Sequence, residues 1–335
     1  MGRDLIISAD PIKPDSEEGA EIVADTERRD FAIDKALHGS RLDQAMAALV
    51  PEFSRSYLRQ LIDAGCVEVD GKATSKPAQR MRAGQRGCIE LRPTPQSQAF
   101  RAEQIDFPIV FQDEHLLVVN KPAGLVVHPA PGNWSGTLLN GLLALDAIAS
   151  TLPRAGIVHR LDKNTSGLMV VARSRQVMDA LVKMIASREV NRHYLAVTAK
   201  TWPGPNTRDV EAPIGRDPRN RLRMAVVDTA RDVGKPAKTT FELMQSSAAA
   251  SLVKCTLHTG RTHQIRVHMA SIGCPLIDDE LYGGALIANP GRPALHASRL
   301  SFEHPVTLQP MRFHVPLPGD LVALLVRCGL SYNEV

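Results

Sequence analysis

Aromatic side chains are scarce in this sequence, because Phe, Trp and Tyr together make up 4% of its 335 residues. Proteins that hold single-stranded nucleic acids without sequence preference commonly stack successive bases on aromatic rings. The composition therefore argues against an extended stacking surface. Charged residues, at 23%, and apolar residues, at 44%, are present in amounts typical of a folded protein with a sizeable core.

Long apolar runs are also missing. No segment approaches the roughly 18 consecutive apolar residues that a membrane-spanning helix requires. The first residues, MGRDLIISADP, do not show the basic stretch followed by an apolar one that marks a secretory signal. We therefore expect a cytoplasmic protein that has no membrane partner.

The usual motifs for metals and cofactors are absent as well. The five cysteines lie far apart without a CxxC pair, which predicts buried free thiols. HExxH, GxGxxG, the P-loop, the GxSxG elbow and the zinc-deaminase signature do not occur. His258, His263 and His268 are each five residues apart, so neighbours would lie about 140° apart around a helix. We expect no metal and no cofactor.

The charge is unevenly distributed along the chain. The net charge is +4, yet residues 1–30 contain nine acidic and four basic side chains. These residues lack apolar periodicity, and we interpret them as an acidic disordered tail. The remainder of the chain is therefore clearly basic, which suits an RNA partner, although many basic proteins bind no nucleic acid.

Residues 31–93 have the pattern of a small folded unit. Apolar side chains recur at helical spacing over 42–49, and Ser54 can cap a second helix. Alternating residues 67–69 then lead into an Asp70–Gly71 turn, and GQRGCIELRP supplies another short strand. The prediction is a helix–helix–strand unit.

This unit carries a one-sided charge. Residues 54–92 contain eight basic side chains and only four acidic ones. Charge alone leaves a solvated surface and a nucleic-acid interface about equally plausible. The string SRLDQAMAAL…SRSYLRQLIDAGCVEVDGK…MRAGQ, however, closely resembles the S4 RNA-binding domain over residues 38–92. The resemblance implies a basic face on structured RNA, with candidate contacts at Arg41, Arg55, Arg59, Lys72, Lys76, Arg80 and Arg82.

We predict that residues 94–108 form a linker and that residues 109–335 form a larger domain. Strands and helices intermix in the larger domain without a βαβ rhythm, which favours an α+β fold with a mixed, largely antiparallel central sheet and flanking helices. We expect strands at 116–120, 125–127, 168–172, 194–199 and 253–258, and helices at 137–147, after Ser174 and after Gly260.

A polar cluster within GIVHRLDKNTSGLMVVA, residues 156–172, lies between two apolar runs. Asp162 is a carboxylate among bases and hydroxyls there, a setting that would keep it ionised and usable as a nucleophile or a base. From spacing alone, an aspartate that caps a loop turn is the more common meaning of such a residue.

The string HRLDKNTSGLMVVA, with LLVVNKPAGLVVHP upstream and GRTHQIRVHMASIGCPLIDDELYGG downstream, resembles the RluA family of pseudouridine synthases over residues 105–320. The resemblance implies the pseudouridine synthase fold and the isomerisation of an extruded uridine without a cofactor. The S4-like unit and the basic stretch IGRDPRNRLRMAV are similar to the subgroup that acts on large-subunit ribosomal RNA, which adds Arg219, Arg221 and Arg223 as RNA contacts. Asn164 and Ser166 depart mildly from the more usual HRLDKDTTGL.

The resemblance also implies roles for individual residues. Asp162 corresponds to the catalytic aspartate, Tyr194 to the active-site tyrosine, and Arg266 to the basic partner of the aspartate. Around them, the implied supporting residues are Ile265 beside the base, Arg160 in the gap that the extruded base leaves, and His159 next to it.

Two alternatives stay open at this point. One is the same isomerisation at another ribosomal or transfer-RNA site; the other is a non-catalytic ribosome-assembly protein that binds RNA. The joint presence of Asp162, Tyr194 and Arg266 argues against the second, since a decayed enzyme should lose such residues first. We expect a monomer whose partner is ribosomal RNA of the large subunit or its precursor particle. The sequence does not indicate which uridines are modified, or whether Asp162 attacks the sugar or the ring.

Overall fold

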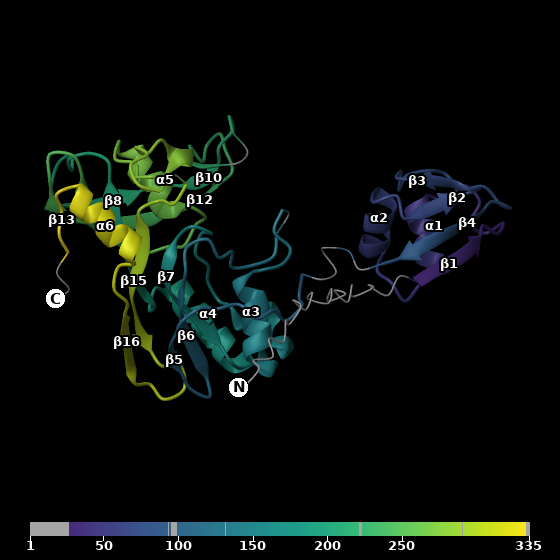
Figure 1. Ribbon diagram of the computed structural model, residues 1–335, viewed down its shortest axis with the longest axis horizontal. Coiled ribbons are helices and arrows are strands. Elements are labelled where there is room, and N and C mark those ends of the chain that lie inside the picture. The colour runs from purple at the N-terminus through teal and green to yellow at the C-terminus, as the bar shows by residue number, and fades with distance from the viewer. Residues whose placement is uncertain are drawn as a thin grey trace, which may run out of the picture. The chain divides into compact units, whose positions relative to one another are not determined.

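The computed structural model describes residues 27–92, 94, 99–130, 132–220, 223–289 and 291–332. The chain forms two compact units, Met1–Ser97 and Gln98–Val335 (Figure 1). The expected acidic tail lies outside the described residues as far as residue 26. Its last four residues differ from the expectation, because residues 27–30 begin strand β1 (Glu27–Ala32).

The first unit is a four-stranded antiparallel sheet with two helices. The strand order is β1-β4-β2-β3, where β2 is Val67–Val69, β3 is Lys72–Thr74 and β4 is Arg86–Leu91. Helices α1 (Leu42–Leu49) and α2 (Arg55–Asp63) confirm the predicted pair. Ser54 caps α2 as expected, since its side chain accepts a hydrogen bond from the Tyr57 amide at 3.2 Å.

The turn between β2 and β3 explains the Asp70–Gly71 signal. Asp70 has φ 51° and Gly71 has φ 75°, the left-handed conformation that tight hairpin turns require at both central positions. Strand β1 was missed because its residues, ERRDFA, are mostly charged. Alternate side chains, Arg29 and Phe31, are nevertheless half-buried, and all six residues pair with β4.

The second unit is built on a larger sheet. Among the described residues, nine strands form this sheet in the order β5-β6-β7-β15-β8-β14-β13-β9, and β16 pairs with β15. Every adjacent pair there is antiparallel except β7 with β15. This pattern confirms the predicted α+β fold with a mixed, largely antiparallel sheet.

The strand bounds of the large sheet are β5 Ile109–Gln112, β6 Leu116–Lys121, β7 Ser166–Ala172, β8 Asn191–Thr198, β9 Thr207–Glu211, β13 Lys238–Ser246, β14 Ser251–Leu257, β15 Leu295–Glu303 and β16 Pro310–His314. The α-helices of this unit are α3 Leu138–Leu145, α4 Arg175–Ser187, α5 Gln264–Ser271 and α6 Gly319–Arg327. Short 3₁₀ helices are η1 Ala147–Thr151, η2 Pro153–Gly156 and η3 Glu280–Tyr282. A small separate sheet is formed by β10 Ile214–Arg216, β11 Met224–Val226 and β12 Gly234–Lys235.

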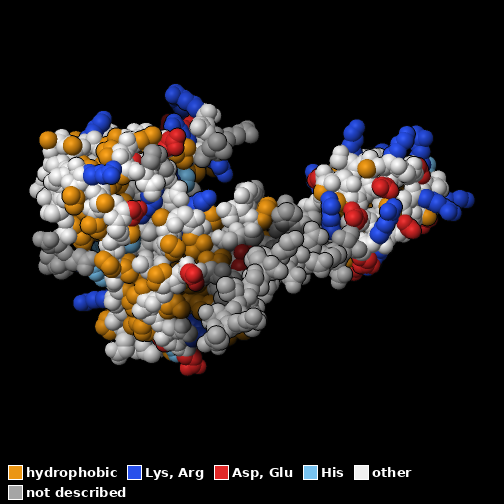
Figure 2. Space-filling view, in the orientation of Figure 1, with side chains coloured by type: hydrophobic (Ala, Val, Ile, Leu, Met, Phe, Trp, Pro, Cys, Tyr) orange, Lys and Arg blue, Asp and Glu red, His pale blue; other side chains and the backbone are white. Residues whose placement is uncertain are grey.

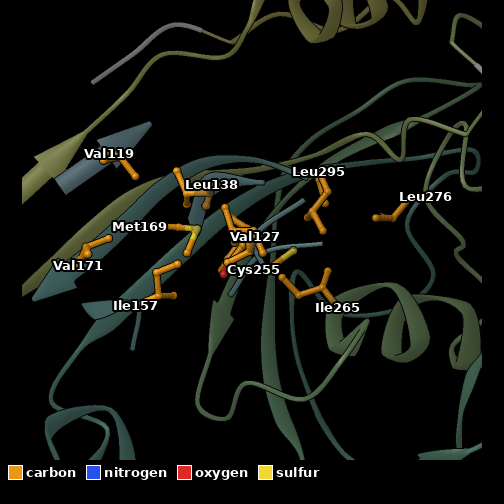
Figure 3. Packing of buried hydrophobic residues seen from close by; sticks show 14 of the residues in the cluster. Val119, Val127, Leu138, Ile157, Met169, Val171, Cys255, Ile265, Leu276 and Leu295 are labelled. Atoms are coloured by element: carbon orange, nitrogen blue, oxygen red, sulfur yellow. The ribbon is translucent and has the colours of Figure 1, made fainter. Parts of the chain in front are cut away.

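Helices α3 and α4 cover opposite faces of the large sheet. Successive side chains of a strand point to opposite faces, and β6 divides in this way. Leu117 and Val119 pack in one cluster with α3, whereas Leu116 and Val118 pack in another with α4. The cluster on the α3 side extends to Ile265 of α5 and to Leu295 of β15, which places a packed apolar floor beneath the polar residues described below (Figure 3).

Two expectations for this unit are wrong. Residues 125–127 form no strand, because Gly124 turns the chain at φ 88° and only Val126 makes a bridge, to Thr137. Residues 99–108, predicted to be part of a linker, belong to the second compact unit. The Asn140 side chain donates hydrogen bonds to the carbonyls of Ala99 and Arg101, at 3.1 and 2.8 Å, which fastens this segment to α3.

The five cysteines are buried and free, as predicted. In the part of the chain that the structure describes, no helix has both the length and the apolar character needed to cross a membrane.

Buried histidines give the second unit a marked pH dependence. Burial lowers the pKa of His159 to about 3 and the pKa values of His128 and His296 to about 4. Unfolding would return each to about 6.5, so the unfolded chain binds more protons below that pH. We expect the free energy of unfolding to fall as the pH drops from 6.5 towards 4, by up to about 1.4 kcal/mol per pH unit for each histidine. Urea unfolding at pH 7 and pH 5 measures this, and equal midpoints would contradict it.

Candidate active site

Asp162 lies in the loop between η2 and β7, and its side chain is 19% exposed. The loop is held through its main chain. The Asp162 carbonyl accepts a hydrogen bond from the Thr165 amide at 3.1 Å, and the Lys163 carbonyl accepts one from the Gly124 amide at 2.9 Å. The KPAG segment, residues 121–124, thus packs directly against this loop.

Lys121 also connects the KPAG segment to the Asp162 loop. It is fully buried, and its ammonium donates to the carbonyls of Pro122, Leu125 and Lys163 at 2.8, 2.8 and 3.0 Å. Burial lowers the pKa of Lys121 to about 7. The three carbonyls favour the charged form, because only an ammonium has three N–H donors. Lys121 therefore fixes the Asp162 loop without touching the carboxylate.

A second buried cation holds the loop from its other end. Arg292 donates to the Asn164 carbonyl at 2.8 Å and to the Ser166 hydroxyl at 2.9 Å. Because Ser166 accepts that bond, its own proton is available to His296 Nδ1, at 2.8 Å. Asn164 and Ser166, the two departures from the usual family string, thus both connect the loop to residues 291–296.

Arg266 of α5 reaches Asp162 from the opposite wall. Its Nη1 lies 3.3 Å from Asp162 Oδ2. The same guanidinium makes two shorter hydrogen bonds, both 2.8 Å, to the fully buried carboxylate of Asp279. Burial opposes the charge of Arg266, but Asp279 and Asp162 outweigh that effect and raise its pKa. Arg266 is therefore a cation shared by two carboxylates, and sequence reasoning did not identify Asp279.

His263 forms a third neighbour of Asp162. Tyr282 accepts a hydrogen bond from the Met224 amide at 3.0 Å, so its hydroxyl proton is available to His263 Nδ1 at 2.9 Å. Burial lowers the pKa of His263, which favours the neutral ring at pH 7. The remaining proton then sits on Nε2, 3.9 Å from Asp162 Oδ1. Tyr282 also lies under the Arg266 guanidinium, 4.9 Å from ring centre to carbon.

Tyr194 of β8 lines the same pocket as Asp162 and is 5% exposed. Burial raises the pKa of Tyr194 to about 12, and the charge of Asp162 adds to that shift while Arg192 opposes it. The phenol therefore carries its proton at neutral pH. In this state it can donate a proton or a hydrogen bond, but it is not a base.

The pocket itself is small, about 60 Å³, and brings together residues that are far apart in the sequence. Of the six predicted site residues, five line it: Arg160, Asp162, Tyr194, Ile265 and Arg266. His159 does not, because its Nε2 accepts a hydrogen bond from the Val170 amide at 3.0 Å and the ring supports strand β7. Arg160 is exposed at the rim.

The three histidines considered as metal ligands have separate partners. His258 bonds to Thr240, His263 to Tyr282 and His268 to Thr239. Within the described ranges, no group of three His, Cys, Asp or Glu side chains is arranged to hold a metal ion.

The predicted RNA contacts of the first unit fall into two groups. Arg41 and Arg55 both pair with buried Asp43, at 2.9 and 2.6 Å. Burial alone would raise the pKa of Asp43, but the bonds from these arginines outweigh it and lower the pKa to about 2. Both arginines thus hold the fold, although their side chains remain partly exposed.

The other predicted contacts are more open to solvent. Lys72 and Lys76 line a groove of about 530 Å³. Arg59 lies 3.8 Å from Asp63, Arg80 donates to the Gly39 carbonyl at 2.8 Å, and Arg82 is exposed. Figure 2 shows many Lys and Arg side chains projecting from this unit on the face turned to the viewer.

The basic stretch of the second unit connects β10 to β11. Arg223 pairs with Asp217 at 2.5 Å, Arg219 is exposed, and Arg221 lies outside the described residues. The Met224 amide that bonds to Tyr282 begins β11, so this stretch adjoins the hydrogen bonds around His263. Figure 1 shows α5 beside β10 and β12.

Comparison with known proteins gives consistent matches. Residues 115–271 match the family model described as RNA pseudouridylate synthase, and residues 40–86 match the S4 domain. The chain is 45% identical to a protein of Neisseria meningitidis named ribosomal large subunit pseudouridine synthase D, with 90% of this chain and 82% of that protein covered. Proteins of the same name from Xanthomonas campestris and Escherichia coli are 44% and 40% identical, with 90% and 88% of this chain and 92% and 93% of those proteins covered.

Among solved structures, human RNA pseudouridylate synthase domain containing 4 is similar, with a TM-score of 0.52 and 26% identity over 68% of this chain and 94% of that chain.

Proposed function

This chain belongs to the RNA pseudouridylate synthase family and is an RNA pseudouridine synthase, and from that premise we propose that it converts specific uridines of large-subunit ribosomal RNA to pseudouridine. Relatives that cover most of the chain share one name, which refers to the ribosomal large subunit. The S4 match adds a module typical of proteins that bind structured RNA. We also propose that the enzyme works as a monomer in the cytoplasm.

The ion pair of Asp162 with Arg266, in a pocket shared with Tyr194, is the observation that carries the chemistry. Isomerisation breaks the bond between C1′ and N1 and forms one between C1′ and C5. N1 gains a proton and C5 loses one, so the reaction is balanced without a redox partner. We propose that Asp162 is the nucleophile that allows this exchange, because its carboxylate faces the pocket and lies 3.3 Å from the Arg266 guanidinium.

The target base must leave its stack to reach this pocket, which costs a few kcal/mol. We propose that Arg160 contributes to that step from the rim, where its guanidinium can stack on the neighbouring bases. Ile265 is 4% exposed and part of the apolar floor, so it offers a packing surface beside the base.

Tyr194 is proposed to move or hold a proton during the exchange. Tyr194→Phe removes only the hydroxyl, so the fold should persist, and we expect the single-turnover rate to fall by about 10²–10⁴-fold. The wild-type rate should not fall through loss of this proton below about pH 10, because the pKa of Tyr194 is raised to about 12. A Phe variant with the wild-type rate would remove Tyr194 from the chemistry.

The S4-like unit is proposed to supply affinity rather than chemistry. Lys72 and Lys76 lie together in one groove, so Lys72→Gln with Lys76→Gln removes two cations from one surface. We expect the slope of log affinity against log salt to become shallower by about 1.4–1.8, the release of roughly two counterions. Turnover at saturating RNA should not change.

A matched control for that experiment is Arg175→Gln with Lys183→Gln, which removes two exposed cations from α4. A salt slope that is the same for the Lys72/Lys76 variant and the wild type would show that this groove does not contact RNA.

The proposed substrate is tested by incubating the purified chain with transcripts of large-subunit ribosomal RNA and of transfer RNA. Mass spectrometry of the digested RNA measures the pseudouridine that forms. We expect it in discrete sites of the ribosomal transcript. Formation only in transfer RNA would keep the chemistry and overturn the substrate.

A further inference from the structure

Arg192 of β8 is a buried cation that lines the pocket of Asp162 and has no part in the chemistry proposed above. It is 6% exposed, about as buried as Tyr194 at 5%. Because side chains two residues apart on a strand point to the same face, Arg192 and Tyr194 enter the pocket from the same side of the sheet. Arg192 therefore belongs to the interior of the pocket.

The guanidinium of Arg192 has no counter-charge in the protein. Among the residues that the structure describes, no ion pair and no side-chain hydrogen bond satisfies it, and its Nε is buried without a partner. An arginine stays charged and has five N–H donors, and burying such a charge unpaired is unfavourable for folding. Arg266 of the same pocket differs, because Asp279 and Asp162 both pair with it. The free donors of Arg192 thus point to a ligand rather than to the fold.

Two neighbours locate this guanidinium. Gly260 precedes α5, and a Cβ added there would lie 3.0 Å from Nη1 of Arg192, so the absence of a side chain leaves room for the cation. Burial raises the pKa of Tyr194 to about 12, and Arg192 is the strongest influence that opposes the rise. The cation is therefore beside Gly260 and close to the phenol of Tyr194.

The depth of Arg192 indicates which part of a nucleotide it would meet. An extruded nucleotide places its base in the pocket, while its phosphates stay with the strand outside. Exposed Arg160 at the rim can therefore reach the strand, whereas buried Arg192 faces the base. Uracil offers a guanidinium, which has donors only, its two carbonyl oxygens, O2 and O4.

The isomerisation makes these carbonyl oxygens more negative. If Asp162 bonds to C1′, N1 leaves with the electron pair of the C1′–N1 bond, and the ring anion shares its charge with O2 and O4. If Asp162 bonds to C6, the electron pair of the C5–C6 double bond is displaced towards O4. Formation of the C1′–C5 bond, loss of the C5 proton and gain of a proton at N1 then return the ring to neutrality. A donor already in place stabilises such a charge more in the transition state than in the ground state.

We propose that Arg192 is a further catalytic residue, whose guanidinium donates hydrogen bonds to a carbonyl oxygen of the extruded uracil and stabilises the negative charge that the ring acquires during the exchange. The inference rests on the proposed role of Asp162. It also implies selection against cytosine, because the amine at C4 of that base is a donor and does not match a guanidinium.

Arg192→Met removes the charge and keeps a long side chain. We expect the single-turnover rate, measured by tritium release from C5, to fall by about 10²–10³-fold. RNA affinity should stay within a few-fold, because this cation does not meet a phosphate. The urea midpoint without RNA should be unchanged or higher, since an unpaired buried charge is lost. Arg192→Lys should recover part of the rate. The control Arg175→Met, which removes an exposed arginine of α4, should match wild type in all three measurements.

A change in the substrate tests the contact itself. RNA is prepared with 2-thiouridine or 4-thiouridine at the target position, each tritiated at C5, because sulfur accepts hydrogen bonds weakly. The ratio of the wild-type rate to the Arg192→Met rate should be about tenfold smaller on one of these two substrates than on uridine, since the sulfur already weakens the bond that the variant removes. Equal ratios on all three substrates would show that Arg192 contacts neither O2 nor O4.

Other results would also overturn the proposal. An Arg192→Met variant that unfolds would make Arg192 a structural cation. A variant that loses affinity and salt dependence, but keeps the wild-type rate at saturating RNA, would make it a phosphate contact. Failure of wild type to release tritium from the ribosomal transcript would refute the proposed function, whereas wild-type release by Arg192→Met would refute the role of Arg192 alone.

Discussion

Asp162→Asn is expected to lower the single-turnover rate of pseudouridine formation by at least about 10⁴-fold, with RNA affinity within a few-fold of wild type. The amide nearly matches the carboxylate in shape, but it is neither an anion nor a useful nucleophile. The loop should keep its position, because Lys121 and Arg292 hold it through main-chain carbonyls and Ser166 rather than through Asp162. Tritium release from RNA labelled at C5 of uridine measures the rate.

The control for this prediction is a neighbour on the same loop. Lys163→Gln changes an exposed side chain but keeps the carbonyl that Lys121 and Gly124 bind. It should retain most of the activity. Substantial tritium release by Asp162→Asn would remove Asp162 from the proposed role.

Arg266→Met should affect both stability and activity. It leaves Asp279 buried without its cation, and breaking a buried ion pair typically costs about 3–5 kcal/mol of unfolding free energy. It also takes away the cation that lies 3.3 Å from Asp162, so activity at pH 7 should fall by about 10²-fold or more.

Two further variants separate these effects. Arg266→Lys should recover part of the activity, since it restores the charge but not the paired bonds to Asp279. Arg266→Met with Asp279→Leu removes both members of the buried pair, so it should regain stability while activity stays low. Wild-type activity of a folded Arg266→Met variant would mean that the chemistry does not need the Arg266 cation beside Asp162.

Part of the site could be predicted because its residues stand in recognisable strings. Asp162 stands in HRLD, between two apolar runs, and Arg266 follows Ile265 on a helix whose apolar face is visible in the sequence. Asp279 and Tyr282 could not be found in this way. Their importance depends on contacts with Arg266, Met224 and His263, which only the folded chain brings within bonding distance.

Charge counting had a similar limit in the first unit. The sequence gives the number of arginines there but not which of them already have a buried partner. Arg41 and Arg55 prove to hold Asp43, whereas Lys72 and Lys76 line an open groove. The apolar run at 125–127 resembled a strand, but after the turn at Gly124 its carbonyls accept hydrogen bonds from the amides of Leu138 and Leu139 at the start of α3.

The central claim is that this chain isomerises uridines of large-subunit ribosomal RNA with Asp162 as the essential group. Mapping pseudouridines in that RNA from a strain that lacks the gene, complemented with either wild type or Asp162→Asn, tests it most directly. We predict that discrete pseudouridines disappear in the deletion strain, return with wild type and stay absent with Asp162→Asn. An unchanged map in the deletion strain, or full restoration by Asp162→Asn, would contradict the account.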